Sequence, residues 1–474
     1  MNNPKKTKIV CTIGPATSSE EKLTQLVNAG MNMMRLNFSH GDFAEHQVKI
    51  DNLKKVLKKN PQPIAVLQDL GGPKIRIGEF STKTVMLKAG AKLTITTDQI
   101  VGDENRVSVN YPLFAKEMKV GDPVLLDDGK KRLEVVEIRG KEVVCKIIIG
   151  GETKGRRGLN LPGSDLSMSS ITEKDRADIA FGLKNKVDYF ALSFVRRPED
   201  ITELKNILVK AKSEARIIAK IETPQALKNI EEILKLTDGV MVARGDLAIE
   251  IPAEDVPLVQ KNLIRRCNEL GKPVITATQM LESMIKSPIP TRAEVSDVAN
   301  AVLDGTDAVM LSEETTLGEF PVEAVKMMTK IAMKIEKDSH YRDLVGSRKY
   351  NDPVKRKSDA LGNGAIEVAK ECDAKMIVAL TDKGFAARMI SRYKPEQKIL
   401  ALTPKETTRN QLALSYGCIP VLCKKFDEIS HVIKESKNLI LKNKLAVKGD
   451  KIVMVFGFPL GQASGTNALV VETL

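Results

Sequence analysis

The sequence alternates strand-like and helical segments eight times before about residue 340. Short apolar runs begin near positions 8, 31, 63, 187, 216, 239, 272 and 307, and a stretch of helical periodicity eventually follows each one. Strands that alternate with helices predict a parallel sheet, because each helix returns the chain to the same end of the sheet. Eight such units favour a closed (β/α)₈ barrel, or TIM barrel, over an open doubly wound sheet.

Residues that start and stop helices support this pattern. The amphipathic segment SSEEKLTQLVNAG opens on serines and ends at Gly30, which predicts a helix. Further helices are expected near 43–59 and 172–185. Thr223 and Pro224 predict a helix start directly after the fifth strand, because threonine caps helices well and proline suits the first turn.

A segment of different character, residues 70–166, interrupts the barrel pattern. Its short β-rich runs are separated by turns such as DDG at 127–129, which predicts a small antiparallel β domain inserted after the third strand. Barrel enzymes work at the carboxyl ends of their strands, so the insertion is expected to form a lid over the active site. The barrel domain would then comprise 1–69 and 167–339.

Residues 340–474 are expected to form a separate α/β regulatory domain. A polar, basic stretch at 337–359 is typical of a linker. Beyond it the runs MIVAL, KILAL, CIPVL, KIVMVF and ALVVET alternate with helical segments.

Composition excludes several classes of function. Lysine and arginine exceed acidic residues by 13, which suits an anionic small substrate or nucleic acid. Aromatic residues make up only 4% and tryptophan is absent, so we expect no nucleic-acid partner. No apolar run approaches the roughly 18 residues of a membrane span, and the first residues lack the pattern of a signal peptide. The six scattered cysteines suit reduced thiols in a cytoplasmic protein.

Charged and polar residues stand where the predicted barrel strands end. A barrel gathers the carboxyl ends of its strands at one mouth, so these side chains are expected to converge. They are Arg35, Asn37, Ser39 and His40 on the second strand, Asp69, Lys74 and Arg76 on the third, Lys220 and Glu222 on the fifth, Gly245 and Asp246 on the sixth, and Thr278 on the seventh.

The fifth strand, RIIAKIE, carries Lys220 and Glu222 two residues apart. Side chains two apart in a strand share a face, so both point the same way. Burying two charges costs several kcal/mol each before pairing. A structural ion pair is one explanation, and a polar site at the end of the strand is the other. The neighbouring polar strand ends favour the site.

Glu222 and Asp246 lie on adjacent strands and can hold one Mg²⁺ or Mn²⁺, with water and substrate oxygens completing the ligands. Arg35, Arg76 and Lys220 would face an anion. Cations around a carboxylate-bound metal suit phosphoryl transfer, which depends on stabilising negative charge. Taken singly, each residue also has a structural explanation: Asp246, for example, can cap a helix.

Nine segments, in this order, resemble one enzyme family. They are KTKIVCTIGPAT, MMRLNFSHG, GPKIR, GLNLPG, IIAKIETPQAL, VMVARGDLAIEI, ATQMLESM, TRAEVSDVANAVLDGTDAVMLSEET and GTNALVV. The chain is similar to the pyruvate kinases from about Lys5 to its end. The resemblance implies a glycolytic enzyme that transfers the phosphoryl group of phosphoenolpyruvate to ADP, giving pyruvate and ATP. It also implies a homotetramer.

The resemblance assigns roles at the reacting centre. Glu222 and Asp246 would ligate the divalent cation that bridges phosphoenolpyruvate to the protein. Lys220 would lie beside the transferring phosphoryl group, and Arg35 would hold the substrate phosphate.

It also assigns the substrate carboxylate to the backbone of Gly245 and Asp246 together with Thr278. Thr278 would lie near the face where enolpyruvate takes up a proton, so the implied catalytic residues are Lys220, Thr278 and Arg35.

The nucleotide phosphates would meet Arg76, with His40 and Asn37 nearby. Arg157, before GLNLPG in the lid, stands where the family often has lysine. It keeps the charge but changes the geometry of the contact.

Many pyruvate kinases hold K⁺ between the second and third strands. The matching ligands here are the side chains of Asn37, Ser39 and Asp69 and the carbonyl of Leu70. Members that require K⁺ usually have glutamate in GPxIR, where this chain has Lys74. An ammonium beside the site would repel K⁺ by more than about 1 kcal/mol, so K⁺ is predicted not to be required. The alternative is that Lys74 turns outward and pairs with a lid carboxylate.

The loop TDKGFAAR follows the strand MIVAL and opens a helix. Backbone N–H groups at a helix start suit phosphate, so Thr381, Lys383 and Gly384 form a possible binding loop for a sugar phosphate or AMP. An ordinary strand-to-helix loop is the alternative. Members that respond to sugar phosphates often have small hydroxyl residues where Phe385 stands.

Two other functions remain open. A metal-dependent aldolase or lyase that forms a pyruvate enolate needs the same Glu222 and Asp246, but lacks the inserted domain, GPKIR and the C-terminal domain. A catalytically silent binding protein would not need Lys220 and Thr278 as well. Pyruvate formation from phosphoenolpyruvate and ADP separates these possibilities.

Overall fold

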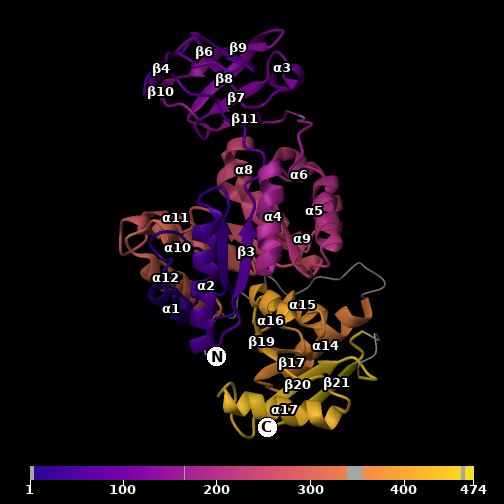
Figure 1. The fold of residues 1–474 in the computed structure, drawn as a ribbon. Helices are drawn as coiled ribbons and strands as arrows, with labels where there is room; N and C mark the ends of the chain where they lie inside the picture. The colour runs from indigo at the N-terminus through magenta and orange to yellow at the C-terminus, as the bar shows by residue number, and fades with distance from the viewer. Residues whose placement is uncertain (1–4, 165, 339–355, 461–464) are drawn as a thin grey trace.

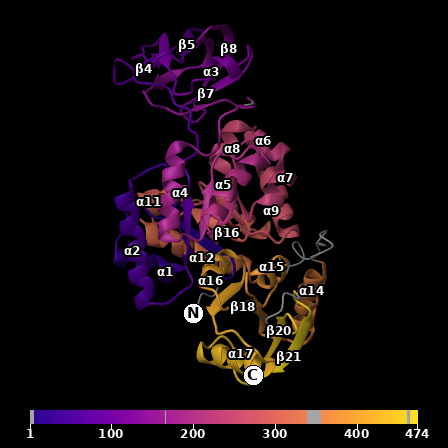
Figure 2. The same cartoon turned by 45° about the vertical axis from the view of Figure 1, so that its right-hand side comes forward.

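The computed structural model describes residues 5–164, 166–338, 356–460 and 465–474. Three parts follow one another along the long axis of the molecule (Figures 1 and 2). The inserted β domain lies at one end, a barrel in the middle and the C-terminal domain at the other end. In the part of the chain that the structure describes, no helix is long and apolar enough to cross a membrane.

Eight parallel strands close into the predicted barrel. Their order around the ring is β1-β16-β15-β14-β13-β12-β3-β2. The strands are buried along almost their whole length, as a parallel sheet covered by helices requires. They are β1 (Lys8–Thr12), β2 (Met33–Asn37), β3 (Ala65–Asp69), β12 (Tyr189–Leu192), β13 (Arg216–Ile221), β14 (Gly239–Ala243), β15 (Val274–Ala277) and β16 (Ala308–Leu311).

Helices surround the barrel, and their ends agree with the sequence signals. Ser19 accepts a hydrogen bond from the N–H of Lys22, and Gly30 ends the first helix with a φ of 125°. Thr223 caps α6, with Pro224 as its first residue. The helices are α1 (Glu20–Ala29), α2 (Phe43–Lys59), α4 (Glu173–Asn185), α5 (Pro198–Lys210), α6 (Pro224–Lys228), α7 (Ile230–Leu236), α8 (Arg244–Glu250), α9 (Val256–Glu269), α10 (Arg292–Leu303), α11 (Glu313–Thr316) and α12 (Pro321–Ile335).

The insertion after β3 is a mixed β domain with its own hydrophobic core. The predicted antiparallel pairing holds except between β5 and β6, which are parallel because residues 97–105 carry the chain back along the sheet. The six-stranded sheet has the order β11-β7-β8-β9-β5-β6, and β10 pairs with β4. The elements are β4 (Val85–Leu87), β5 (Lys92–Thr96), β6 (Arg106–Ser108), α3 (Phe114–Glu117), β7 (Pro123–Leu126), β8 (Lys131–Arg139), β9 (Glu142–Ile149), β10 (Gly151–Thr153) and β11 (Leu159–Asn160).

The C-terminal part is the predicted α/β domain. Its sheet has the order β19-β18-β17-β20-β21, parallel except for β21. Of the linker predicted at 337–359, residues 339–355 lie outside the described residues. The elements are α14 (Arg356–Glu371), β17 (Met376–Leu380), α15 (Phe385–Ser391), β18 (Lys398–Thr403), α16 (Glu406–Gln411), β19 (Cys418–Leu422), α17 (Ile429–Lys442), β20 (Lys451–Phe456) and β21 (Ala468–Thr473).

The C-terminal domain closes the end of the barrel opposite the lid. Ala413 and Leu414, from a 3₁₀ turn after α16, belong to the same buried cluster as Val10 and Met33 inside the barrel. The hydroxyl of Tyr189, at the start of β12, donates to the carbonyl of Gln411 at 2.8 Å. The barrel and the C-terminal domain therefore share a core, whereas the lid has its own.

Candidate active site

Four buried charged side chains meet where β2, β3 and β13 end. Arg35 Nε lies 2.7 Å from Asp69 Oδ2, and Lys220 Nζ lies 3.3 Å from Asp69 Oδ1 and 2.8 Å from Glu222 Oε1. Positive and negative charges thus alternate in the order Arg35, Asp69, Lys220, Glu222. The side chain of Asp69 is 1% exposed and that of Lys220 11%, so these are buried pairs. We call these four residues the charged cluster.

The charged cluster fixes the protonation of its members. Burial lowers the pKa of Lys220, but the carboxylates of Asp69, Glu222 and Asp246 outweigh it and raise the pKa. Burial raises the pKa of Asp69, but Lys220 and Arg35 outweigh it and lower the pKa below its usual range. Lys220 is therefore a permanent cation at neutral pH, and Asp69 a permanent anion.

Ser193, just after β12, joins this cluster and was not predicted. Lys220 Nζ donates to its hydroxyl at 2.7 Å, and that hydroxyl donates to the carbonyl of Leu70 at 2.7 Å. Its position after the fourth strand, in ALSF, is the signal that could have identified it.

The two predicted metal ligands differ in their surroundings. Oε2 of Glu222 accepts the N–H of Phe194 at 2.7 Å, whereas Oε1 is buried and pairs with Lys220 Nζ at 2.8 Å. Burial and the charge of Asp246 raise the pKa of Glu222 against the opposing effect of Lys220. The carboxylate of Asp246, in the first turn of α8, forms neither a hydrogen bond nor an ion pair with the described residues.

These two carboxylates fit a divalent cation. The buried Oε1 of Glu222 and the unpaired carboxylate of Asp246 are hard oxygen donors, which Mg²⁺ prefers. Within the described ranges, no group of three or more His, Cys, Asp or Glu side chains is arranged to hold a metal. The remaining ligands would therefore have to be water and substrate oxygens.

Thr278 has a strained backbone and lies against Gly245. Its φ of 69° is rare for a β-branched residue and costs about 1–3 kcal/mol. Its hydroxyl accepts the N–H of Gly245 at 2.8 Å and donates to the carbonyl of Ala277 at 2.7 Å. Arg244 Nη2 donates to the carbonyl of Thr278 at 2.8 Å. These contacts fix the hydroxyl at the end of β15.

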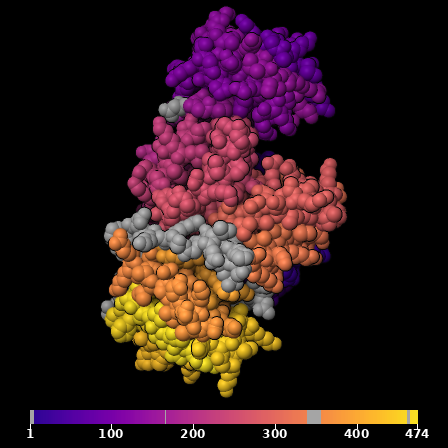
Figure 3. Space-filling model, turned by 180° about the vertical axis from the view of Figure 1, so that it is seen from behind, coloured from indigo at the N-terminus to yellow at the C-terminus, as the bar shows by residue number. Residues whose placement is uncertain are grey.

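A cavity of about 350 Å³ lies between the lid and the barrel mouth. From behind, the molecule is hollowed on one side at this level (Figure 3). Four of the residues predicted for the nucleotide or K⁺ line the cavity, namely His40, Lys74, Arg76 and Arg157, together with Asp246. Seven polar or charged lining residues that the sequence did not assign to the site are Asp127, Asp128, Asn160, Arg196, Thr223, Gln225 and Glu250.

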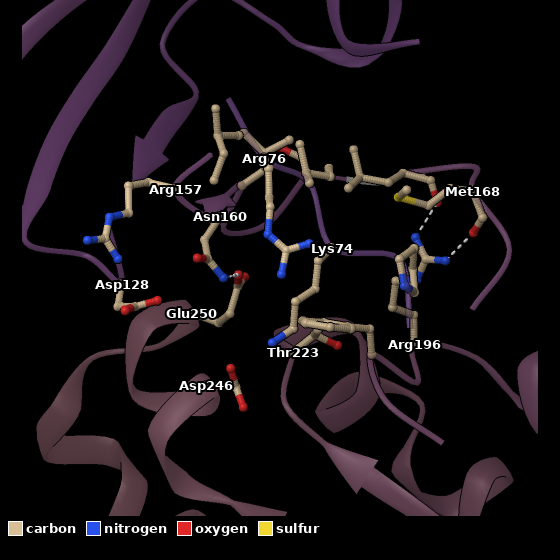
Figure 4. Close-up of a pocket in the computed structure, with 18 of the residues that line it drawn as sticks. Lys74, Arg76, Asp128, Arg157, Asn160, Met168, Arg196, Thr223, Asp246 and Glu250 are labelled. Atoms are coloured by element: carbon tan, nitrogen blue, oxygen red, sulfur yellow. Dashed lines mark hydrogen bonds between the residues drawn. The ribbon is translucent and has the colours of Figure 1, made fainter. Parts of the chain in front are cut away.

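Cations dominate one side of this cavity. Lys74 and Arg76 belong to the segment that leads from β3 into the lid, and both point into the cavity (Figure 4). Burial, followed by the charges of Lys74, Arg76 and Arg35, lowers the pKa of His40. His40 is therefore expected to be neutral at pH 7, so the permanent charge there comes from the lysine and the arginines.

Lys74 forms no ion pair with a lid carboxylate in the described part of the chain. Of the two lid carboxylates that line the cavity, Asp127 pairs with Lys131 at 2.5 Å and with Arg157 at 3.5 Å. Asp128 forms no ion pair with the described residues. The ammonium of Lys74 is exposed on the cavity wall.

Three of the four predicted K⁺ ligands, Asn37, Asp69 and the carbonyl of Leu70, already have partners within the protein. Asn37 Oδ1 accepts the N–H of Ser39 at 3.1 Å. Asp69 pairs with two cations. The carbonyl of Leu70 accepts the hydroxyl of Ser193.

Two side chains from the barrel hold the returning lid segment. Arg196 donates to the carbonyls of Leu166, at 2.7 Å, and Met168 (Figure 4). Gln225, at the start of α6, donates to the carbonyl of Ser164 at 2.8 Å. Sequence patterns did not identify these contacts, because their partners are backbone atoms of a distant segment.

The predicted effector loop lies at the other end of the barrel. The carbonyl of Lys383 accepts hydrogen bonds from Arg216 at 2.7 Å and Arg388 at 3.2 Å. Gly384 has a φ of 80° and precedes α15, which has only seven residues. Thr381 donates its N–H to the carbonyl of Leu402 at 2.9 Å. The loop thus contacts Arg216 at the start of β13, the strand whose other end carries Lys220.

Comparisons with known proteins agree with this geometry. The pattern of the family described as "Pyruvate kinase, barrel domain" matches residues 4–325, and that of "Pyruvate kinase, alpha/beta domain" matches residues 359–472. The pyruvate kinase of Clostridium perfringens is 44% identical over 474 residues, covering 99% of this chain and 100% of the relative. The chain belongs to the pyruvate kinase family.

Other pyruvate kinases are similar over nearly the whole chain. The enzyme of Geobacillus stearothermophilus is 44% identical over 99% of this chain and 80% of its own length. The crystal structure of a pyruvate kinase from Cryptosporidium parvum superposes with a TM-score of 0.92 at 37% identity, covering 99% of this chain and 96% of that one. The chain is thus a phosphotransferase that converts phosphoenolpyruvate and ADP to pyruvate and ATP, and pyruvate kinase chemistry implies a divalent metal.

Proposed function

We propose that pyruvate kinase chemistry takes place where the charged cluster meets the cavity. The observation that carries this is Lys220, a buried cation held between Asp69 and Glu222 at the end of β13. A fixed cation in a site of low dielectric constant stabilises developing negative charge without reorganisation. Lys220 would neutralise the transferring phosphoryl group, and Arg35 would hold the substrate phosphate. Asp69 would position both cations, since it pairs with each.

Glu222 and Asp246 would hold the divalent cation, Mg²⁺ or Mn²⁺. When bound, such an ion supplies positive charge to the substrate oxygens. The unpaired carboxylate of Asp246 and the buried Oε1 of Glu222, whose charge partner is Lys220, support this assignment. The backbone of Gly245 and Asp246 together with the hydroxyl of Thr278 would bind the substrate carboxylate. The N–H of Gly245 and the hydroxyl of Thr278 lie 2.8 Å apart, and the carboxylate would replace their present acceptors, Thr278 Oγ1 and the carbonyl of Ala277. Thr278 would also lie near the carbon that takes up a proton.

Arg76, His40 and Arg157 would contact the nucleotide, since all three line the cavity. Asn37 does not line the cavity, and its amide oxygen accepts the N–H of Ser39. Asn37 would therefore support the nucleotide site from behind the cavity wall.

A coupled assay of the purified chain tests this function. We expect pyruvate to form only when phosphoenolpyruvate, ADP and Mg²⁺ are all present. Release of pyruvate from a 4-hydroxy-2-oxo acid without ADP would instead indicate an aldolase or lyase. No product from either substrate would favour a silent binding protein.

We also propose that K⁺ is not required, because Lys74 supplies the positive charge that K⁺ would bring. Three observations support this. Lys74 forms no ion pair with a lid carboxylate among the described residues, its charge lowers the pKa of His40, and Asp69 already pairs with two cations. A second cation a few ångströms away would be repelled by more than about 1 kcal/mol.

The test compares rates in potassium chloride and tetramethylammonium chloride at matched ionic strength. The parent should be equally active in both salts, whereas Lys74→Glu should become dependent on K⁺. Lys83→Glu, at an exposed lid position away from the cavity, serves as the charge-matched control. A parent that needs K⁺ would refute the proposal.

Three further assignments belong to this proposal. The domains would comprise 1–69 with 167–339, 70–166 and 340–474, and the boundary at 339/340 lies outside the described residues. The molecule would act as a cytoplasmic homotetramer, and its six free cysteines suit that compartment; sedimentation velocity tests the assembly.

The loop with Thr381, Lys383 and Gly384 would bind a sugar phosphate or AMP. Its contact with Arg216 on β13 supports a route to the active site. Rates at subsaturating phosphoenolpyruvate that do not change with these compounds would contradict this assignment.

A further inference from the structure

Helix α8 carries two carboxylates one turn apart. Asp246 and Glu250 are four residues apart, so they lie on the same face of the helix, and both line the cavity. In Figure 4, Glu250 lies between Asp246 and the lid. The pyruvate kinase roles assigned above use Asp246 and leave Glu250 without one.

The lid contacts α8 at two points. Asn160 Nδ2, from β11, donates to Glu250 Oε1 at 3.1 Å (Figure 4). Gly129, in the turn after β7, faces Ile249, and a Cβ added to this glycine would lie at an ordinary van der Waals distance, 3.5 Å, from Ile249 Cγ2. The helix that presents Asp246 is therefore also a surface on which the lid rests.

The strands at this contact carry other residues of the cavity wall. β11 pairs with β7 through Leu159–Leu126 and Asn160–Leu125. Asp127 and Asp128 follow β7 directly, and Arg157 lies two residues before β11. A shift of Asn160 relative to α8 would therefore move the lid side of the cavity as a unit.

We propose that Glu250 is a positioning residue that sets the height of the lid above the nucleotide through Asn160. Its surroundings suit this role. Burial, followed by the charges of Asp246 and Glu222, raises the pKa of Glu250 to about 7, and the hydrogen bond from Asn160 opposes the shift. Whether charged or neutral, the side chain keeps an oxygen that can accept the amide N–H. The proposal rests on the nucleotide site described under the proposed function.

The test compares KM for ADP with KM for phosphoenolpyruvate. Glu250→Ala should raise KM for ADP about tenfold, the size expected for one hydrogen bond to a carboxylate, and change KM for phosphoenolpyruvate less than twofold. Asn160→Ala should behave in the same way. Glu250→Gln keeps an acceptor oxygen and should restore most of the affinity. Glu254→Ala, at an exposed position beyond α8, is the matched control.

The double variant separates positioning from general damage. If Glu250 acts through Asn160, the variant with both alanines should have the same KM for ADP as either single variant. Hydrogen exchange in 159–160 and 125–128 should rise in Glu250→Ala and stay unchanged in Glu254→Ala. Additive effects of the two alanines, or equal losses for both substrates, would overturn the proposal. An inactive parent chain would instead refute the proposed function.

Discussion

Lys220 lies between Asp69 and Glu222, so its removal affects two buried carboxylates at once. Its ion pairs with these carboxylates measure 3.3 and 2.8 Å. A buried charge that loses its partner typically costs several kcal/mol.

We therefore predict two effects of Lys220→Met. The rate of phosphoryl transfer should fall by about 10²–10³ or more, as for the loss of one electrostatic contact in the transition state. The thermal unfolding midpoint should also fall, and Mg²⁺ should restore part of it by neutralising Glu222. Lys228→Met, at an exposed position on α6, should change neither quantity. Near-normal turnover of a folded Lys220→Met protein would remove Lys220 from the reaction.

Glu222 and Asp246 should respond differently to neutral substitution. Each variant, Glu222→Gln and Asp246→Asn, removes a charged oxygen ligand and should raise the Mg²⁺ concentration needed for half-maximal rate. Glu222→Gln should in addition be less stable, because it removes the ion pair with the buried Lys220, although the amide keeps an oxygen for the N–H of Phe194. Asp246→Asn should keep the stability of the parent, because its carboxylate has no such partners. A Mg²⁺ titration that superimposes on the parent curve would exclude that residue as a ligand.

At the scale of elements, β13 joins two distant sites. Arg216 at its start binds the carbonyl of Lys383, and Lys220 near its end belongs to the charged cluster. Four residues of extended strand span about 13 Å. A strand hydrogen-bonded on both sides within the barrel transmits displacement with little bending, so the C-terminal loop and the reacting centre share one rigid element.

Asp188, directly before β12, should make the stability of the protein depend on pH. Burial, followed by the charge of Glu406, raises the pKa of Asp188 to about 7 against the opposing hydrogen bond from the N–H of Val66. The folded state thus favours the neutral acid. The contribution of neutral Asp188 to stability is complete below the usual pKa of the carboxyl, near 3.8. This contribution is lost as the pH rises through about 7.

Asp188→Asn should therefore gain stability relative to the parent between pH 5 and pH 8, by a few degrees in the unfolding midpoint. The amide keeps an oxygen for the N–H of Val66 and cannot ionise. Asp427→Asn, at an exposed position, should follow the parent at every pH. A constant difference between Asp188→Asn and the parent would show that Asp188 does not titrate in this range.

Sequence patterns predicted those parts of the site that lie at strand ends. Lys220, Glu222 and Asp246 could be found because barrel topology brings strand ends together whatever their partners. Asn160 and Glu250 could not, because their contact depends on how far the lid closes over α8. The parallel pairing of β5 and β6 was missed for a related reason: short apolar runs reveal strands but not their direction.

At the scale of the whole molecule, cores define which parts unfold together. The lid core contains residues of the insertion alone, whereas Leu414 lies among residues of the barrel interior. Leu414→Ala should therefore destabilise the barrel and the C-terminal domain together, by about 2–5 kcal/mol. The lid should keep its own stability. Hydrogen exchange in increasing urea, measured separately for peptides of each part, reports the stabilities of the barrel, the C-terminal domain and the lid.

The control is Leu422→Ala, which truncates a half-exposed leucine in the same domain. Loss of protection confined to the C-terminal domain in Leu414→Ala would mean that the two cores are energetically separate.

The shared core also sets the order in which the domains can fold during synthesis on the ribosome. Val10 and Leu414 pack in one cluster although 403 residues separate them in the chain. The barrel ring needs β16 before it closes, and its far end stays open until residue 414 has left the exit tunnel. Long-range contacts of this kind form late and leave apolar surface exposed to chaperones in the meantime. The lid, whose core needs nothing beyond residue 168, can fold while most of the barrel is still unmade.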